Sequence, residues 1–177
     1  ERVEFMVPSN LKVVGNSAFM DCLSLETIEI PETLVSIGDA AFDGCISLPQ
    51  INLPPSLETI GKSAFKFCKS LEHIELPEKL VSVEDSLFYG CSSLGDIKLP
   101  TQLKRVGANA FVDCKLTCIK IPDSVRTIEH HAFLMCNALQ EIHLPNGLET
   151  IAHEMFLGCN ALTEIEIPDS VTSIGDH

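Results

Sequence analysis

Apolar side chains in this chain follow a short pattern that changes its period partway through and then starts again. After Leu25, apolar residues fall at Ile28 and Ile30, while Thr27 and Glu29 are polar. This alternation places Ile28 and Ile30 on the inward side of a β-strand and Thr27 and Glu29 on its outward side. The pattern therefore predicts a short strand that is buried on one face.

The residues that follow predict a turn, a second short apolar pair and one turn of helix. Pro31 ends the strand, because proline has no N–H group to donate to the sheet. The second apolar pair is Leu34 and Ile37. Phe42 and Cys45 then fall three residues apart, which is the spacing of one helical face. We therefore expect one helical turn with both side chains directed inward.

The same unit recurs along the chain in steps of 23 residues, with one step of 22 where only Lys115 separates Cys114 from Leu116. The recurring prolines are Pro8, Pro31, Pro54, Pro77, Pro100, Pro122, Pro145 and Pro168. The recurring phenylalanines are Phe19, Phe42, Phe65, Phe88, Phe111, Phe133 and Phe156. The cysteines that follow them are Cys22, Cys45, Cys68, Cys91, Cys114, Cys136 and Cys159. Because one coil cannot bury its apolar face alone, the repeat predicts stacked coils that share one core.

Composition and charge narrow the possible partners. The chain has 177 residues, 45% of them hydrophobic, which is sufficient for one folded domain over residues 1–177. Its net charge of −13 disfavours nucleic acid and anionic lipid surfaces as partners. No apolar run approaches the ~20 residues of a membrane span, so we expect no direct membrane insertion. We interpret the chain as a segment of a longer protein.

The coil resembles the BspA-like, or Treponema-type, class of leucine-rich repeats. The resemblance rests on IEIPDSVTSIG at residues 165–175 and AFDGC at residues 41–45, and it covers essentially the whole chain. It implies an α/β repeat solenoid, in which right-handed leucine-rich-repeat coils stack with a parallel concave sheet and with short strands and single helical turns on the other side. It also implies a cell-surface or secreted location, because several members of the class act in adhesion.

The cysteines are predicted to be structural. Seven of the eight occupy one inward repeat position, so we interpret them as buried free thiols, with a disulfide or a metal site as the alternative. Cys118 takes an outward strand position and is the one thiol that we expect to react.

The histidines are a weaker candidate for chemistry. His130 and His153 occupy equivalent positions in neighbouring coils, so we expect their rings to stack, with Glu129 and Glu154 nearby. A divalent metal could bind there, but no recognised zinc-binding spacing is present, and we predict neither a metal nor a cofactor. No nucleophile, base and orienting group converge, so we predict that the chain is not an enzyme.

The outward strand positions are the predicted protein-binding surface, because solenoids bind partners there and these residues vary between coils. The positions are Thr27, Glu29, Gln50, Asn52, His73, Glu75, Asp96, Lys98, Cys118, Lys120, Glu141, His143, Glu164 and Glu166. This surface is acidic at both ends, with Lys98 and Lys120 in the middle, and suits a partner of basic or mixed charge. It carries no large aromatic residue, which predicts weak binding by one segment.

The predicted function is therefore a protein-binding module of a surface or secreted adhesion-type protein, with a host or extracellular-matrix protein as ligand. The alternative is an intracellular scaffold or an inert structural spacer. The terminal coils also look uncapped, since Phe5 and Val7 are apolar and the last coil stops at His177. Such ends predict end-to-end dimerisation.

Overall fold

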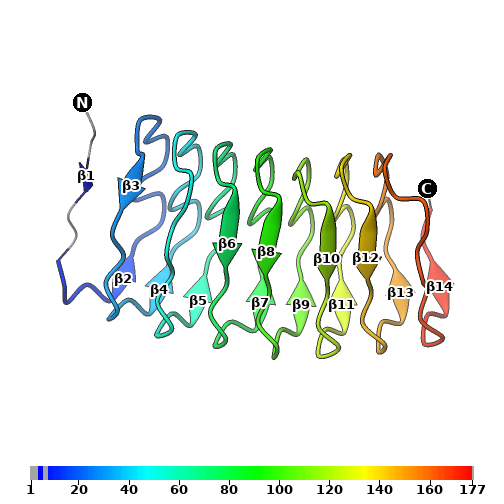
Figure 1. Cartoon of the computed structure of the whole chain (residues 1–177). Coiled ribbons are helices and arrows are strands. Elements are labelled where there is room, and N and C mark those ends of the chain that lie inside the picture. The colour runs from blue at the N-terminus through cyan, green and yellow to red at the C-terminus, as the bar shows by residue number, and fades with distance from the viewer. Residues whose placement is uncertain (1–3, 6–7, 177) are drawn as a thin grey trace.

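The computed structural model describes residues 4–5 and 8–176, which form a stack of about seven coils (Figure 1). Each regular coil contributes to two rows of short strands that are joined by turns. The first row contains β1 (Glu4–Phe5), β3 (Thr27–Ile28), β6 (His73–Glu75), β8 (Asp96–Lys98), β10 (Cys118–Lys120) and β12 (Glu141–His143). The second row contains β2 (Val13–Val14), β4 (Ser36–Ile37), β5 (Thr59–Ile60), β7 (Ser82–Val83), β9 (Arg105–Val106), β11 (Thr127–Ile128), β13 (Thr150–Ile151) and β14 (Ser173–Ile174).

The strands of each row pair in parallel, as the repeat predicts. In the first row β1 pairs with β3, β6 with β8, and β10 with β12. The second row forms the sheets β2-β4-β5, β7-β9-β11 and β13-β14. The short step of the repeat lies between β8 and β10, where one first-row sheet ends and the next begins. In contrast, the second row continues from β7 through β9 to β11 past the same coil.

The predicted helical turn is wrong: the described residues contain no helix, and the segment after the second strand is a run of turns. Its alternate N–H groups donate to the next coil, from Ala40 N to Lys62 O, from Phe42 N to Ala64 O and from Gly44 N to Lys66 O, all at 2.8 Å. A helix would direct these N–H groups back along its own chain and forfeit the contacts between coils. The solenoid is therefore built from strands and turns, rather than from strands and helices.

The core is a ladder of phenylalanine rings, as the repeat predicts. Neighbouring rings of the series from Phe19 to Phe156 stack nearly parallel, with centroids 5.2–5.9 Å apart. The rings from Phe42 to Phe133 are fully buried, and the leucine and isoleucine positions of the coil pack around them. Each central ring thus contacts a ring in the coil before and another in the coil after.

The cysteine ladder beside the rings has a role that the sequence did not predict. From Cys45 to Cys159, each thiol of the ladder donates a hydrogen bond to the backbone carbonyl of the phenylalanine in the preceding coil, as from Cys91 Sγ to Phe65 O at 3.0 Å and from Cys136 Sγ to Phe111 O at 3.0 Å. Burial raises the pKa of Cys91 and of Cys136 to about 12. These thiols are free and protonated, and they bridge successive coils as well as filling space.

A charge network links four successive coils along the second row. Arg105 contacts Asp85, Glu84 and Glu129, with 3.0 Å from its Nε to Glu129 Oε1. Lys62 Nζ lies 2.9 Å from Asp85 Oδ2. Burial by itself would raise the pKa of Asp85, but hydrogen bonds from Lys62 and Arg105 outweigh burial and hold the pKa below its usual value. Arg105 and its three carboxylate partners are each about one-third exposed, so the network is partly shielded from water.

Candidate binding surfaces

The predicted binding positions form one exposed row, which we call the strand face. In β6, β10 and β12 the outer two residues are exposed and the central isoleucine is buried. In β8 the central Ile97 is half-buried. The strands thus place eight predicted residues outward in register: His73, Glu75, Asp96, Lys98, Cys118, Lys120, Glu141 and His143.

The remaining predicted positions extend this row beyond the regular strands. Thr27 lies in the two-residue strand β3 and is half-buried, and Gln50 pairs with His73 through a single bridge. Four residues are exposed but lie outside assigned strands, and they are Glu29, Asn52, Glu164 and Glu166. The structure therefore brings the predicted positions onto one side, with regular strand geometry in the middle only.

Charges on the strand face are partly neutralised by their neighbours. His73 Nδ1 lies 2.9 Å from Asp96 Oδ2, and Lys98 pairs with Glu75 across β6 and β8. His143 Nε2 lies 2.8 Å from Glu141 Oε1 within β12. All of these side chains are more than half exposed, so water competes with each pair and the pairs stay available to a partner.

Cys118 lies on the strand face, where the sequence predicted it, and its side chain is exposed. Desolvation and the carboxylate of Glu141 raise the pKa of this thiol above its ordinary value. The local environment therefore does not activate Cys118 as a nucleophile, although a reagent can reach it.

Two shallow hollows lie along the strand face. The larger has a volume of about 390 Å³ and is lined by Asn52, His73 and Glu75 together with Pro77. The other has a volume of about 280 Å³ and is lined by Lys120, His143 and Glu166, among others. Each hollow opens where a first-row strand meets the proline turn that follows it, so strand-face residues form part of both linings.

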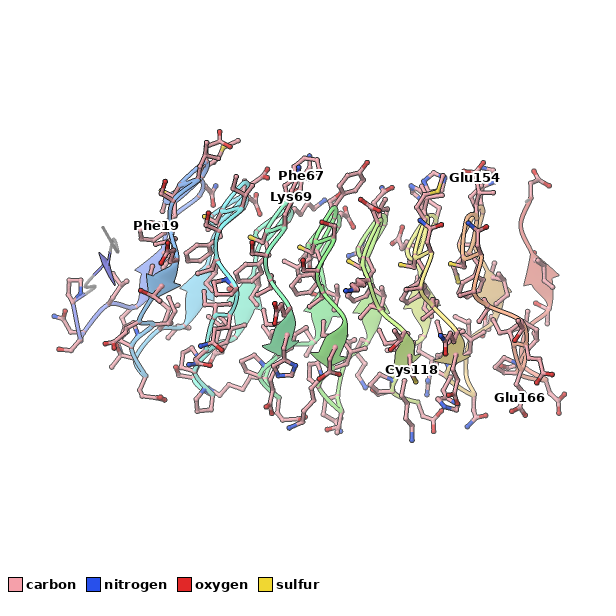
Figure 2. All side chains as sticks on the ribbon, turned by 45° about the horizontal axis from the view of Figure 1, so that its top comes forward. Phe19, Phe67, Lys69, Cys118, Glu154 and Glu166 are labelled. Carbon is pink, nitrogen blue, oxygen red and sulfur yellow. The ribbon has the colours of Figure 1, made fainter. Side chains whose placement is uncertain are left out.

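A second surface was missed by the sequence reasoning, because that reasoning considered outward strand positions only. We call it the turn edge; it contains exposed apolar side chains of the turns, namely Met20, Leu23, Ile46, Phe67, Met135 and Leu157. In Figure 2, Phe67 and Glu154 lie along one edge of the solenoid, and Cys118 and Glu166 lie along the opposite edge. Large apolar residues outside the core positions of the repeat are the sequence feature that could have revealed this surface.

Phe67 is the most unusual residue of the turn edge. Its φ is 55°, in the left-handed region that a bulky residue rarely adopts. Its ring packs edge-on against Tyr89, with centroids 5.5 Å apart, and Lys66 Nζ lies 5.1 Å from the Phe67 centroid. The ring also covers Gly90, where an added Cβ would come within 2.4 Å of it. Glycine at position 90 therefore makes room for the aromatic side chain of the preceding coil.

The histidine prediction needs a correction. The ring recorded beside His153, with centroids 5.5 Å apart, belongs to His131 and not to His130. His130 instead lies edge-on to His131 at 5.0 Å. The left-handed backbone at His131, with φ of 59°, changes the direction of its side chain, and sequence spacing does not reveal this change.

The predicted end-to-end contact stays a prediction. Val7 and His177 lie outside the described residues, and only the backbone of Phe5 lies within them. No helix in the described part of the chain is long and apolar enough to cross a membrane.

Comparison with known proteins agrees with this architecture. The sequence matches the family model described as "BspA type Leucine rich repeat region", in six copies over residues 3–86 and 58–177. The chain therefore belongs to the BspA-type leucine-rich-repeat family, as its coil pattern predicts. This family is a repeat fold and not a known class of enzyme. No match is found among curated proteins.

Solved structures of bacterial leucine-rich-repeat proteins share the fold. A protein from Bacteroides ovatus is 34% identical with a TM-score of 0.92, over 97% of this chain and 45% of its own. The T. pallidum leucine-rich-repeat protein is 32% identical with a TM-score of 0.84, over 92% of this chain and 79% of its own. A leucine-rich cell surface protein from Faecalibacterium prausnitzii is 21% identical with a TM-score of 0.53, over 97% of this chain and 77% of its own. The chain thus spans less than half the length of the Bacteroides protein.

Proposed function

We propose that the chain is a protein-binding module that engages its ligand through the strand face. The observation that carries this proposal is the contrast between the inward and outward residues of the same strands. From Ile28 to Ile165 the first inward position is always isoleucine and the second is isoleucine or leucine, whereas the outward pairs differ from coil to coil. Packing accounts for the inward residues, but nothing in the coil geometry requires a particular outward residue, so these positions are free to specify a ligand.

The chemistry of the strand face suits a protein of basic or mixed charge. Glu29 lies toward one end of the row and Glu164 and Glu166 toward the other, while Lys98 and Lys120 lie between them. The charged side chains are exposed and only loosely paired, so a partner can replace the existing pairs at little cost. The two hollows provide concave points for side chains of the ligand.

We further propose that the parent protein acts at the cell surface or outside the cell, in adhesion to host or extracellular-matrix proteins. The BspA-type family supports this location, and the Faecalibacterium neighbour is itself named a cell surface protein. The scaffold or spacer alternative predicts a strand face that binds nothing.

Binding to immobilised fibronectin, laminin and collagen tests the proposal. The test variant carries Ala at Glu75, Lys98, Lys120 and His143. The matched control carries Ala at Glu58, Lys79, Lys104 and Thr127, four exposed residues in or beside the second strand row and its turns. The control also removes a Glu–Lys pair, because Lys79 Nζ lies 2.8 Å from Glu58 Oε1.

We expect the strand-face variant to lose at least tenfold in affinity for the matrix protein that the native chain binds, and the control to keep it. Equal affinity of all three proteins would remove the strand face as the binding site. In that case Phe67→Ala and Tyr89→Ala would show whether the turn edge binds instead. A native chain that binds none of the three proteins would favour the spacer.

A further inference from the structure

One surface position of the repeat joins neighbouring coils in three of the first four coils, where it is asparagine or aspartate. Asn16, Asp39 and Asp85 each accept a hydrogen bond from a backbone N–H of the next coil, at 2.9, 2.8 and 3.3 Å. These side chains tie neighbouring coils together. In the late coils the same position holds His130 and His153.

The next position of the coil changes in the same way. It has a left-handed backbone in every coil where the structure describes it, with φ between 48° and 59°. The early coils carry small side chains here: Ser17, Ala40, Ser63, Ser86 and Asn109. The last two coils carry His131 and Glu154 instead. The repeat therefore accounts for the backbone conformation of this segment. It does not account for the imidazoles of His130, His131 and His153 or for the carboxylate of Glu154.

The left-handed backbone brings His131, His153 and Glu154 into one cluster at the turn edge (Glu154 in Figure 2). His131 Nε2 lies 3.1 Å from Glu154 Oε2, and His153 Nε2 lies 3.5 Å from Glu154 Oε1. One potential ligand atom from each residue lies within 4.8 Å of the others. The carboxylate thus presents one oxygen to each imidazole.

Neighbouring coils hold the cluster in position. His131 N donates to His153 O at 3.1 Å, and Glu154 N donates to Asp176 O at 3.1 Å. The side chains of His131 and Glu154 are only about a quarter exposed. His131 Nε2 is itself buried and makes no hydrogen bond of acceptable geometry in the described structure, although Glu154 is close. A buried ring nitrogen without a hydrogen bond calls for an explanation, and a bound cation supplies one.

We propose that His131, His153 and Glu154 form a binding site for a divalent transition-metal ion, with Zn²⁺ as the best match. Two imidazoles and a carboxylate are a common zinc ligand set, whereas Mg²⁺ and Ca²⁺ prefer oxygen ligands alone. Two ligands at ~2.1 Å from a tetrahedral ion lie ~3.4 Å apart. The separations of 3.1 Å from His131 Nε2 to Glu154 Oε2 and of 3.5 Å from His153 Nε2 to Glu154 Oε1 fall on either side of this value, each to a different oxygen of the carboxylate. Water would complete the coordination, and the ion would join two neighbouring coils.

A second group of ligand-type residues provides the competing assignment. Cys118, Glu141 and His143 also place one potential ligand atom each within 4.8 Å of one another. They lie on the strand face, however, where Glu141 and His143 are more than half exposed. His131 and Glu154 are less exposed than Glu141 and His143, so the histidine cluster is the more shielded of the two, and the experiment below distinguishes them.

The experiment titrates Zn²⁺ into the untagged chain in a Cys118→Ser background, which removes the exposed thiol. Calorimetry gives the stoichiometry and affinity, and Co²⁺ in place of Zn²⁺ reports ligand geometry through its visible absorption. The three test variants are His131→Asn, His153→Ala and Glu154→Gln. Asparagine is chosen for position 131 because Asn109 adopts φ of 58° at the equivalent position, so the coil accepts it. His130→Ala is the matched control, since His130 adjoins the cluster but is outside the ligand set.

We expect one Zn²⁺ per chain, a higher melting temperature in the presence of Zn²⁺, and at least a tenfold loss of affinity in each test variant. The His130→Ala control should bind as the parent does. The assignment fails if the Cys118→Ser parent binds no Zn²⁺, if the three test variants bind normally, or if His130→Ala weakens binding as much as His153→Ala. Binding that is present only while Cys118 is intact would assign the metal to the strand face instead.

Discussion

The buried phenylalanine–cysteine ladder and the strand face recur with the same period, but they are made of opposite kinds of contact. In the ladder every coil presents the same ring and the same thiol, and the contacts are buried. On the strand face each coil presents a different pair, and the contacts are exposed ion pairs. The ladder stabilises the stack of coils, whereas the residues of the strand face can differ from coil to coil.

This difference has a physical cause. A ring that is buried between two others loses both contacts when it is truncated, and the cavity that remains cannot collapse. An exposed ion pair is solvated before and after its removal, so little free energy is lost. Recognition residues can therefore differ from coil to coil only where the contacts between coils contribute little to stability.

Alkaline pH should weaken the phenylalanine–cysteine ladder strongly. Burial raises the pKa of Cys91 and of Cys136 to about 12, so the folded chain keeps protons that the unfolded chain loses above about pH 9. Stability that these thiols contribute is complete below that pH and falls as pH rises, on the order of 1.4 kcal/mol per pH unit for each buried thiol. Urea unfolding between about pH 8 and pH 10 measures the slope. Cys91→Ala should reduce the dependence of the unfolding free energy on pH by the contribution of one thiol. An unchanged pH dependence would contradict a raised pKa for Cys91.

Truncation of one central ring should be the most disruptive substitution. Phe88 stacks between Phe65 and Phe111, so Phe88→Ala should lower the free energy of unfolding by roughly 3–5 kcal/mol. Phe67→Ala makes the same chemical change at an exposed ring and should cost less than about 1 kcal/mol. Denaturant unfolding followed by circular dichroism compares the two variants. Equal losses would mean that burial in the ladder does not set the energy.

Arg105 tests an intermediate case, because its side chain is about one-third exposed and contacts three carboxylates. Arg105→Ala should destabilise the chain by roughly 1–2 kcal/mol, since Asp85 and its neighbours lose their main cation. High salt should reduce the difference between Arg105→Ala and the native chain. A loss that is independent of salt would indicate that packing, and not charge, explains the effect.

The thiol hydrogen bond can be separated from simple space filling at Cys91. If the S–H···O contact to Phe65 O contributes, Cys91→Ser keeps a donor and should be more stable than Cys91→Ala by about 0.5–1 kcal/mol. If the thiol acts only as a small apolar group, the order reverses, because a buried hydroxyl carries a desolvation cost. The same unfolding assay decides between the two orders.

Removal of a strand-face pair should have the smallest effect. The Lys98 and Glu75 side chains are about 60% exposed, so Lys98→Ala and Glu75→Ala should leave the unfolding midpoint within error of the native value. A clear shift in the midpoint would show that the strand face is part of the stabilising framework. The proposal that its residues are free to vary would then fail.

Much of the architecture could be predicted because the repeat is visible without any contact map. The positions of Pro31, Ile28 and Phe42 within one coil predicted the turn, the inward strand residue and the buried ring, and each prediction is confirmed. The spacing of Phe42 and Cys45 led to the wrong prediction of a helical turn. Residues three apart also flank a single hydrogen-bonded turn, as Cys45 N and Phe42 O do here, so the spacing does not require a helix. Alternate N–H groups of this segment donate to carbonyl oxygens of the next coil instead of forming a helix. The sequence of one coil does not reveal hydrogen bonds to a neighbouring coil.

The order of residues is enough to predict the coil, its period, the burial of the rings and thiols, and the outward direction of the strand-face pairs. These features follow from a local alternation of polar and apolar residues that is repeated often enough to be read. Three features become visible only in the folded stack: the thiol-to-carbonyl bonds, the position of Phe67 over Gly90, and the contact of His131 with His153 and Glu154. Each of these depends on a contact between coils or on a left-handed backbone torsion, and neither has a signature in the order of residues along one coil.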